Sequence, residues 1–330
     1  MTEFGVVVPS WGEYGDPARI REVIVAAEDL GYHTAWFGDH IVIPDYAAHI
    51  SAPNWFDPLT CCIFGAGITT TLRFGTDVLV APYRNPVVLA KMLSTADQLC
   101  DGRLTLGVGV GYVSGEFTAL GAPPYEERGA ITDEYLSVLD ALWGSDGPIS
   151  FDGRYIHLHD VHFAPRPRQR PFPVFVGGNG AAAYRRAARY GTGWHPLFPT
   201  PDAYRAGRDA ILRRRAEAGR TDGFTFSYSC PHTQVVVEAR HDVAHQATYS
   251  DFGEVPDEYN YAPAPPAAGD GRPMFVGTPE QLVADVSGFV AAGVEHFALR
   301  FWAGSPGVEP AAVVEQMRRF AEDVAPAFTA

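Results

Sequence analysis

Residues 73–112 read RFGTDVLVAPYRNPVVLAKMLSTADQLCDGRLTLGVGVGY. Two apolar runs, Phe74–Ala81 and Leu104–Val110, flank a segment between Pro86 and Cys100 in which apolar residues recur every three or four positions. This pattern predicts a strand, a helix and a second strand. Both strands are apolar almost throughout, as expected for a parallel sheet that is covered on both faces. The stretch therefore predicts a βαβ unit.

The helix of this unit carries its own boundary signals. Asn85 is a candidate N-cap, and Pro86 suits the first helical position, where no backbone N–H is needed. Asp101-Gly102 should end the helix. The face predicted to be buried contains Leu89, Met92, Leu93, Ala96 and Leu99. The second strand runs into glycines that let the backbone approach something flat or bulky, namely Gly107, Gly109 and Gly111.

The same alternation of short apolar strands and amphipathic helices extends along the chain. Further strands are predicted at Phe4–Pro9, Thr34–Phe37, Val174–Val176, Gly193–His195, Phe224–Val237 and His296–Phe301. Further helices are predicted from Pro17 to Leu30 and at Trp55–Gly67, Arg128–Trp143, Ala181–Tyr190, Pro201–Gly219 and Pro310–Ala325, with another opening at Thr278. About eight strands and eight helices close naturally into an α/β TIM (β/α)8 barrel. One domain is expected over residues 1–330, with insertions at about 148–165 and 240–273.

Composition narrows the classes of partner. The net charge of −14 argues against nucleic acid or an anionic membrane surface. No apolar run approaches the roughly 20 residues needed to span a bilayer, and the first residues, MTEFGVVVPS, lack the basic region of a signal peptide. A cytoplasmic protein is therefore expected. The four cysteines show no metal-ligand spacing, so buried free thiols and no metal site are predicted.

Four short motifs in the opening stretch resemble the bacterial luciferase-like superfamily: Thr76–Leu79, Pro82–Pro86, Asp101–Leu104 and Gly107–Gly111. The similarity continues through nearly the whole chain and is greatest to an actinobacterial branch that uses coenzyme F420. Members of the superfamily are TIM-barrel oxidoreductases that depend on a flavin or on this deazaflavin. The resemblance implies the same fold and the same class of activity.

The active site of a TIM barrel lies at the C-terminal ends of its strands. Gly177, Gly178, Asn179 and Gly180 stand at such an end and precede a helix, where free N–H groups and the helix dipole favour a phosphate. A tight βα turn would produce the same cluster. In luciferase-like enzymes a similar loop holds the cofactor phosphate, and Arg189–Trp194 (RYGTGW) also resembles the family. Gly177–Gly180, Trp194 and Gly109 are therefore predicted to bind the cofactor.

Asp39-His40 is the candidate catalytic pair. A histidine whose pKa lies near neutral pH can donate or accept a proton beside a hydride-transfer centre. The preceding carboxylate can form a hydrogen bond to a cofactor. Considered alone, the pair would more simply be a structural turn. Trp36–His40 (WFGDH) resembles the Asp-His pair of deazaflavin-dependent dehydrogenases, which implies that His40 is catalytic and that Asp39 binds the cofactor.

The opening stretch departs from the family pattern at two positions. Asp77-Val78 matches the site where the superfamily often has a non-prolyl cis peptide against the cofactor ring, although a small residue is more common at position 77. Tyr112 stands where the sugar-phosphate dehydrogenases of the deazaflavin group have a catalytic glutamate, so their substrate is not carried over. The nearest acid, Glu116, is either a pocket acid or a residue that starts a helix.

Aromatic and acidic residues at strand ends can form a substrate pocket, with core packing or loop solvation as the alternative for each. The predicted pocket contains Trp11, Glu13, Tyr83, Tyr112, Glu116, His195 and Trp302. The insertion at 240–273 is expected to cover the barrel mouth and to influence substrate choice.

The leading hypothesis is a coenzyme F420-dependent oxidoreductase that transfers a hydride between deazaflavin C5 and a small organic substrate. The first alternative is an FMN-dependent monooxygenase supplied with reduced flavin by a partner reductase. The second is a flavin-binding protein without turnover. A homodimer is expected because the family commonly forms one.

Overall fold

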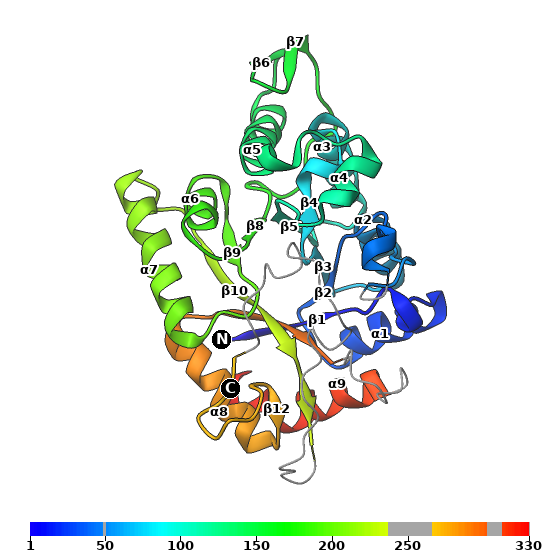
Figure 1. The fold of residues 1–330 in the computed structure, drawn as a ribbon, viewed down its shortest axis with the longest axis vertical. Helices are drawn as coiled ribbons and strands as arrows, with labels where there is room; N and C mark the ends of the chain where they lie inside the picture. The colour runs from blue at the N-terminus through cyan, green and yellow to red at the C-terminus, as the bar shows by residue number, and fades with distance from the viewer. Residues whose placement is uncertain (49–50, 237–265, 302–311, 330) are drawn as a thin grey trace.

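The βαβ unit predicted from residues 73–112 is present in the computed structural model, which describes residues 1–48, 51–236, 266–301 and 312–329 (Figure 1). The first predicted strand is divided into β3 (Arg73–Thr76) and β4 (Leu79–Val80), and the peptide bond between Asp77 and Val78, which lie between them, is cis. Helix α3 (Pro86–Leu99) then leads to β5 (Leu104–Gly109).

The ends of α3 follow the sequence signals, but its buried face differs from the prediction. Asn85 Oδ1 accepts hydrogen bonds from the N–H groups of Val87 and Val88 at 2.9 and 3.3 Å. Met92 and Leu99, which were predicted to be buried, are 38% and 69% exposed. The buried stripe is instead rotated toward Ala90 and Asp97. On this stripe the Asp97 carboxylate accepts two hydrogen bonds from Gln169, one from its backbone N–H at 2.9 Å and one from its side-chain amide at 2.7 Å.

Eight parallel strands form a closed barrel, as predicted. Their bounds are β1 Glu3–Val7, β2 Thr34–Phe37, β3, β5, β8 Val174–Gly177, β9 Gly193–His195, β10 Thr225–His232 and β13 His296–Arg300. Each strand pairs with the next along the chain, and β1 pairs with β13 to close the ring. Phe74 lies opposite Leu104 and Glu3 lies opposite His296 in the register. Since all the strands run in parallel, their C-terminal ends meet at one end of the barrel.

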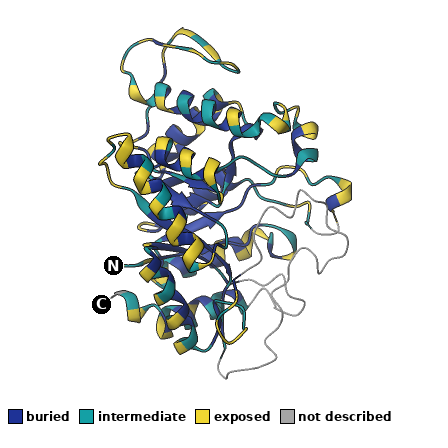
Figure 2. Ribbon diagram, turned by 60° about the vertical axis from the view of Figure 1, so that its left-hand side comes forward, coloured by how far each residue is buried: buried dark blue, intermediate teal, exposed yellow. Residues whose placement is uncertain are grey.

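Helices surround the barrel, with buried residues facing the strands and exposed residues facing outward (Figure 2). The other helices are α1 Pro17–Asp29, α2 Pro58–Ile68, α4 Ser114–Leu120, α5 Arg128–Gly144, α6 Ala181–Tyr190, α7 Pro201–Glu217, α8 Pro279–Ala292, α9 Ala312–Asp323 and α10 Pro326–Thr329. Asp16 caps α1, and Thr278 with Gln281 forms the predicted capping box of α8. Local signals therefore place most helix starts.

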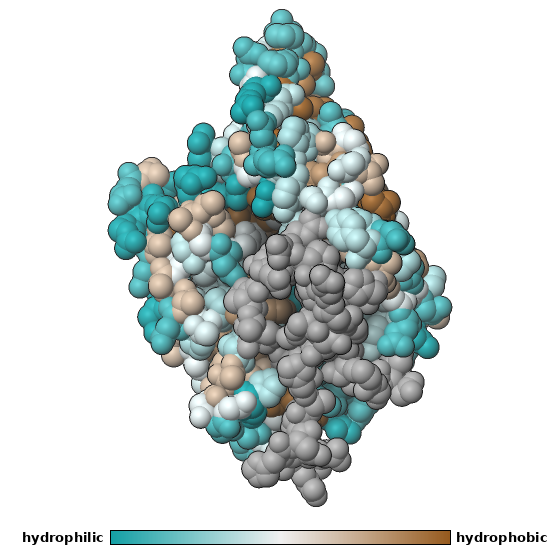
Figure 3. All heavy atoms as spheres, viewed as in Figure 1, coloured by the Kyte–Doolittle hydropathy of each residue, from teal (hydrophilic) through white to brown (hydrophobic). Residues whose placement is uncertain are grey.

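Among the described residues, a hairpin extends the barrel within the predicted 148–165 insertion. Strands β6 (Ile149–Asp152) and β7 (His157–Val161) pair in antiparallel orientation as this hairpin, which projects at the top of Figure 1 and has a hydrophilic tip in Figure 3. The predicted 240–273 insertion lies mostly outside the described residues. On either side of it, β11 (Gln234–Val235) pairs in parallel with β12 (Val276–Gly277).

The cysteine prediction is confirmed, because all four thiols are free and buried. Burial raises the pKa of the Cys61 thiol to about 12 and that of Cys100 to about 11. These thiols therefore stay protonated and unreactive near neutral pH. Within the part of the chain that the structure describes, no helix is both long and apolar enough to cross a bilayer.

Candidate active site

A hydrogen-bonded row of three side chains lies at the C-terminal end of the barrel. His40 follows β2, Tyr112 follows β5, and Glu116 lies in the first turn of α4. His40 Nδ1 is 2.7 Å from Glu116 Oε2, and His40 Nε2 is 2.9 Å from the Tyr112 hydroxyl. Because a carboxylate accepts hydrogen bonds, Nδ1 carries the proton of the neutral ring. Nε2 is then the acceptor and the Tyr112 hydroxyl is the donor.

Glu116 is completely buried and is the anchor of this row. Its Oε1 accepts hydrogen bonds from the backbone N–H groups of Ile41 and Val42, at 2.9 and 3.3 Å, and its Oε2 also accepts from the Tyr83 hydroxyl at 2.9 Å. These donors compensate the burial of a carboxylate. Glu116 is buried in the first turn of α4 and lies behind His40, as in the helix-start alternative, and its role as a pocket acid stays a prediction. Tyr83 is likewise buried and supports Glu116.

A pair of tryptophans flanks His40. The ring centroids of Trp55 and His40 are 4.7 Å apart. Trp11 stacks on Trp55, and their ring centroids are 4.0 Å apart. Trp11 was predicted as a pocket residue, whereas Trp55 was missed because it was assigned to a helix that in fact begins at Pro58. The predicted pocket residue Glu13 is exposed. Trp302 lies outside the described residues.

Asp39 has protein partners on both of its carboxylate oxygens. Its side chain is fully buried, and Arg84 donates to both of its oxygens, at 2.6 and 2.9 Å. The Val80 N–H also donates to Oδ2, at 2.8 Å. The carboxylate is thus enclosed by protein donors at the end of β2, and its predicted contact with a cofactor stays a prediction.

The cis peptide that the resemblance implied at Asp77-Val78 is present. Glycines make room for it. A Cβ atom on Gly109 would lie 2.6 Å from Val78 Cγ2, and one on Gly177 would lie 3.2 Å from Val78 Cγ1. The bulky feature that the glycine-rich strand accommodates is therefore Val78 itself, which remains half-buried at the end of the barrel.

The carboxylate of Asp77 is directed into the barrel. His195 Nε2 and the Ser229 hydroxyl each lie 2.9 Å from Oδ1, and Arg300 pairs with Oδ2. Burial alone would raise the pKa of Asp77, but the Arg300 charge and the hydrogen bonds from His195 and Ser229 lower it below its usual value. The Asp77 and His195 side chains are only 4% and 0% exposed. The Asp77 carboxylate and the His195 ring thus have protein partners inside the barrel, and their predicted roles at a cofactor and a substrate stay predictions.

The glycine loop before α6 has an open backbone. Gly178 has φ +95° and Gly180 has φ +99°, a region that favours glycine. A Cβ atom added to Gly180 would meet no atom within 4 Å. Asn179 Nδ2 donates to the Leu197 carbonyl at 2.8 Å, and Trp194 Nε1 donates to the Gly178 carbonyl at 3.0 Å. Trp194 is fully buried and supports the loop through this bond, and its predicted direct contact with the cofactor stays a prediction.

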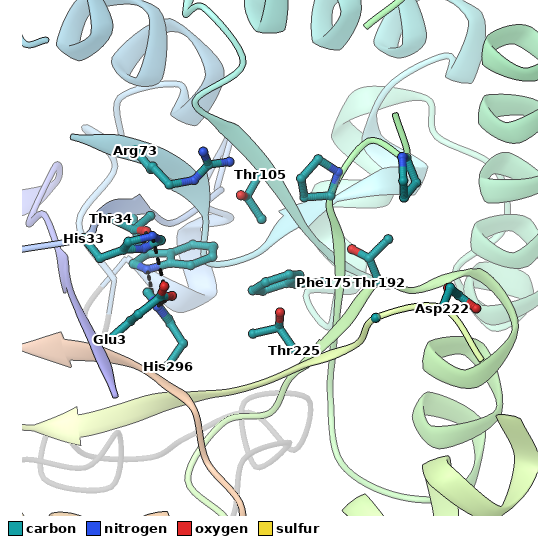
Figure 4. Close-up of a pocket in the computed structure, with 14 residues that line it drawn as sticks. Glu3, His33, Thr34, Arg73, Thr105, Phe175, Thr192, Asp222, Thr225 and His296 are labelled. Carbon is teal, nitrogen blue, oxygen red and sulfur yellow. Dashed lines mark hydrogen bonds and ion pairs between the residues drawn. The ribbon is translucent and has the colours of Figure 1, made fainter. Parts of the chain in front are cut away.

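A cavity of about 420 Å³ lies at the opposite, N-terminal end of the barrel (Figure 4). Glu3, His33 and His296 gather there in an arrangement that could hold a metal ion. Trp36 Nε1 donates to His296 Nε2 at 3.0 Å, however, so the neutral ring keeps its proton on Nδ1, the atom that faces Glu3 at 3.4 Å. A protonated nitrogen does not coordinate a metal. The prediction of no metal site stays a prediction.

Comparisons with known proteins agree with this architecture. The sequence model of the luciferase-like monooxygenase family matches residues 2–296. A relative from Kineococcus radiotolerans, named F420-dependent glucose-6-phosphate dehydrogenase, is 28% identical over 94% of this chain and 93% of its own length. An FMNH2-dependent dimethylsulfone monooxygenase from Pseudomonas putida is 30% identical over 53% of this chain and 48% of its own length. The crystal structure of monooxygenase RslO1 from Streptomyces bottropensis superposes with a TM-score of 0.78 at 22% identity, covering 99% of this chain and all of that one, which shows a shared fold.

Proposed function

We propose that this chain, which belongs to the luciferase-like monooxygenase family, is an oxidoreductase that uses coenzyme F420. The full-length similarity to a relative named as F420-dependent supports this cofactor. The observation that carries the proposal is the row Glu116–His40–Tyr112, because it provides a proton-transfer group at the end of the barrel where the cofactor loop lies.

The residues present fit a phosphate-bearing cofactor. The loop Gly177–Gly180 offers the N-terminus of a ten-residue helix, and an added Cβ at Gly180 would project into open space. Backbone N–H groups in that position attract a phosphate through their partial charges and the helix dipole. We assign the cofactor phosphate to this loop. As the family resemblance implies, the backbone at Asp77-Val78 would face the cofactor ring.

The cofactor, when bound, supplies the hydride acceptor or donor at deazaflavin C5, and the chain supplies orientation and proton handling. His40 exchanges a proton, and Glu116 fixes the imidazole in one tautomer and stabilises its charged form. Trp11 and Trp55 shield one side of His40 from water. Water exclusion strengthens the electrostatic interactions among these groups.

Two alternatives remain open. An FMN-dependent monooxygenase is favoured by the 30% identity to the dimethylsulfone monooxygenase, and it would require a partner that supplies reduced flavin. The second alternative is a flavin-binding protein without turnover, and a buried carboxylate that orients a histidine favours the catalytic alternatives over it. Neither alternative changes the role that we assign to Gly177–Gly180.

A calorimetric titration of the purified protein with coenzyme F420 and FMN, side by side, tests the proposal. We expect tight binding of F420 and weak binding of FMN. Preference for FMN would transfer the protein to the monooxygenase class. Failure to bind either cofactor would contradict the role of the glycine loop.

Assembly and location remain predictions. A homodimer is testable by light scattering of the purified protein, and a cytoplasmic location by fractionation of cells that express the chain.

A further inference from the structure

We propose that Asp77 and Arg300 are positioning residues: the ion pair that they form inside the barrel holds the glycine loop Gly177–Gly180 in the shape that binds the cofactor phosphate. This inference rests on the proposed function and adds to it the part of the barrel that fixes the loop. Neither side chain needs to touch the cofactor, because both act through residues that contact the loop.

The Asp77 carboxylate joins strands that are not its neighbours in the barrel. Asp77 follows β3, whose neighbours in the ring are β2 and β5. His195 lies on β9, Ser229 on β10 and Arg300 on β13. The side chains of Asp77 and Arg300 are only 4% and 13% exposed. Their ion pair therefore crosses the interior and ties one wall of the barrel to the other.

The first connection from this pair to the glycine loop is Val78, the next residue after Asp77. Gly177 ends β8 and begins the loop. A Cβ atom on Gly177 would lie 3.2 Å from Val78 Cγ1 and 3.3 Å from Val78 Cγ2. Val78 thus occupies the space beside Gly177 that a side chain would fill. Because both oxygens of Asp77 are bonded, its neighbour is held firmly against the start of the loop.

The second connection runs through Ser229. Its hydroxyl donates to Asp77 Oδ1 at 2.9 Å and accepts from Arg300 Nη1 at 2.7 Å. The backbone of Ser229 forms a parallel bridge with Leu197. The Leu197 carbonyl accepts a hydrogen bond from Asn179 Nδ2, in the middle of the loop, at 2.8 Å. A second route therefore leads from the ion pair to the loop, from the side opposite Val78.

Arg300 strengthens this second connection. Its guanidinium lies 5.6 Å from the centroid of the Phe198 ring, a distance typical of a cation–π contact. It also donates to the Cys230 carbonyl. Phe198 has a φ of +55°, which is uncommon for a residue other than glycine and is maintained by its surroundings. The segment that receives the Asn179 bond is thus held by the same arginine that pairs with Asp77.

The two connections matter for binding because several backbone N–H groups must bind one phosphate together. Their combined affinity depends on their relative positions, which a fixed scaffold provides. The glycines of the loop cannot supply this rigidity, since Gly178 and Gly180 lack the side chains that would restrict them. The alternative is that the ion pair stabilises the barrel and has no effect on the loop.

Asp77→Asn separates these two roles, with Asp285→Asn as the matched control. Asp285 pairs with Arg272 at 2.7 Å, and their side chains are 4% and 15% exposed, but Asp285 lies on α8, well separated from α6 in Figure 1. Calorimetric titrations use coenzyme F420 and FMN at a temperature where every variant is folded by circular dichroism. We expect Asp77→Asn to raise the dissociation constant of the bound cofactor about tenfold or more, and Asp285→Asn to leave it within about threefold.

Ser229→Ala provides a milder test that keeps both charges, in case Asp77→Asn does not fold. Ser94→Ala is its control, because Ser94 is also completely buried and its hydroxyl accepts from Trp143 Nε1 at 2.9 Å. Ser229→Ala should weaken cofactor binding and Ser94→Ala should not. Since Asp77 and Ser229 share one connection, their double variant should bind within about threefold of the weaker single variant.

A further readout needs no cofactor. In 15N-labelled protein, Asp77→Asn and Ser229→Ala should shift the backbone amide resonances of Gly178 and Gly180, whereas the control Asp285→Asn should not. Unchanged loop resonances in the two test variants would overturn the proposal, as would unchanged cofactor affinity or an equal loss of affinity in the controls.

The proposed function fails separately from this inference. If the unmodified protein bound neither F420 nor FMN, the proposed function would be wrong, and with it the purpose of the loop. The amide resonances would still show whether the ion pair of Asp77 and Arg300 fixes the conformation of Gly177–Gly180.

Discussion

Arg84 donates hydrogen bonds to both carboxylate oxygens of Asp39 and a third to Asp57 at 2.9 Å. Burial alone would lower the pKa of the Arg84 guanidinium, but the bonds and charges of the two carboxylates raise it above its usual value. Asp57 also caps α2. Arg84 thus links Asp39, which precedes His40 after the end of β2, to the start of α2.

Asp39→Asn should lower the free energy of unfolding by about 3 kcal/mol, because it removes one of the two carboxylates that pair with the buried Arg84 guanidinium and leaves only Asp57. Urea unfolding measures this change. Asp202→Asn is the control, since Asp202 pairs with Arg205 but is 93% exposed, and its loss should change stability by less than about 1 kcal/mol. If Asp39→Asn kept full stability and lost only cofactor affinity, Asp39 would be a cofactor ligand after all.

His40→Ala should lower turnover by about 100-fold or more, because it removes the proton-transfer group, and should leave cofactor affinity within a few fold. Steady-state kinetics and calorimetry separate the two effects. His157→Ala is a suitable control, because His157 pairs with Asp152 on the exposed hairpin. Unchanged turnover in His40→Ala would remove this residue from the mechanism.

Gly180→Ala should destabilise the fold by about 1–3 kcal/mol, because a φ of +99° strains any residue other than glycine. It should also weaken cofactor binding more than tenfold, because the new methyl group enters the open space of the loop. Gly219→Ala provides the comparison. Gly219 also has a positive φ, +67°, with no atom near its absent Cβ, but it follows α7. The Gly219→Ala variant should be less stable than the unmodified protein and should bind the cofactor with unchanged affinity. Equal affinities for the two variants would argue against phosphate binding at Gly180.

Gly109→Ala should destabilise the protein by about 1–3 kcal/mol, because the new methyl group would lie 2.6 Å from Val78 Cγ2. Removing the obstructing side chain in the Gly109→Ala, Val78→Ala double variant should restore at least about 1 kcal/mol relative to additivity. Thermal and urea unfolding of both single variants and the double variant complete the cycle. Strict additivity would show that Gly109 is required for another reason.

Stability should decline as the pH falls from about 6.5 to 4. Burial, opposed by the hydrogen bond to Glu3 and assisted by the charge of His33, lowers the pKa of His296 to about 4. In this window the unfolded chain binds a proton that the folded chain excludes, so stability falls with pH by up to about 3 kcal/mol. His296→Gln, whose amide oxygen can still accept from Trp36, should flatten the dependence measured by urea unfolding. An equally steep profile in this variant would place the acid sensitivity in other groups.

The barrel strands and the helix caps were predictable because their causes are local. Apolar runs of strand length, Asn85 before Pro86, and Thr278 three residues before Gln281 specify elements through contacts within a few residues. The misassigned exposure of Met92 and Leu99 has the opposite cause. Which edge of an amphipathic stripe is buried depends on the rest of the fold, and Asp97 on this stripe bonds Gln169, which lies far away in the sequence.

The candidate site was predicted in part. The sequence and its resemblance selected His40, Tyr112 and the glycine loop, and they indicated the cis peptide before Val78. They did not reveal that Glu116 lies behind His40, because 76 residues separate the two. Nor did they reveal Trp55, whose neighbours suggested a helix.

The sequence by itself determined the order of strands and helices, the closed parallel barrel they form, and the end of that barrel where the site lies. Only the tertiary structure decided which polar side chains face outward and which satisfy one another inside. Asp39, Asp77 and His195 stand at strand ends, as site residues do, yet each is enclosed by partners such as Arg84 or Arg300. A buried charge must be paired, and its partner comes from another strand or loop, so the pairing is a property of the closed barrel.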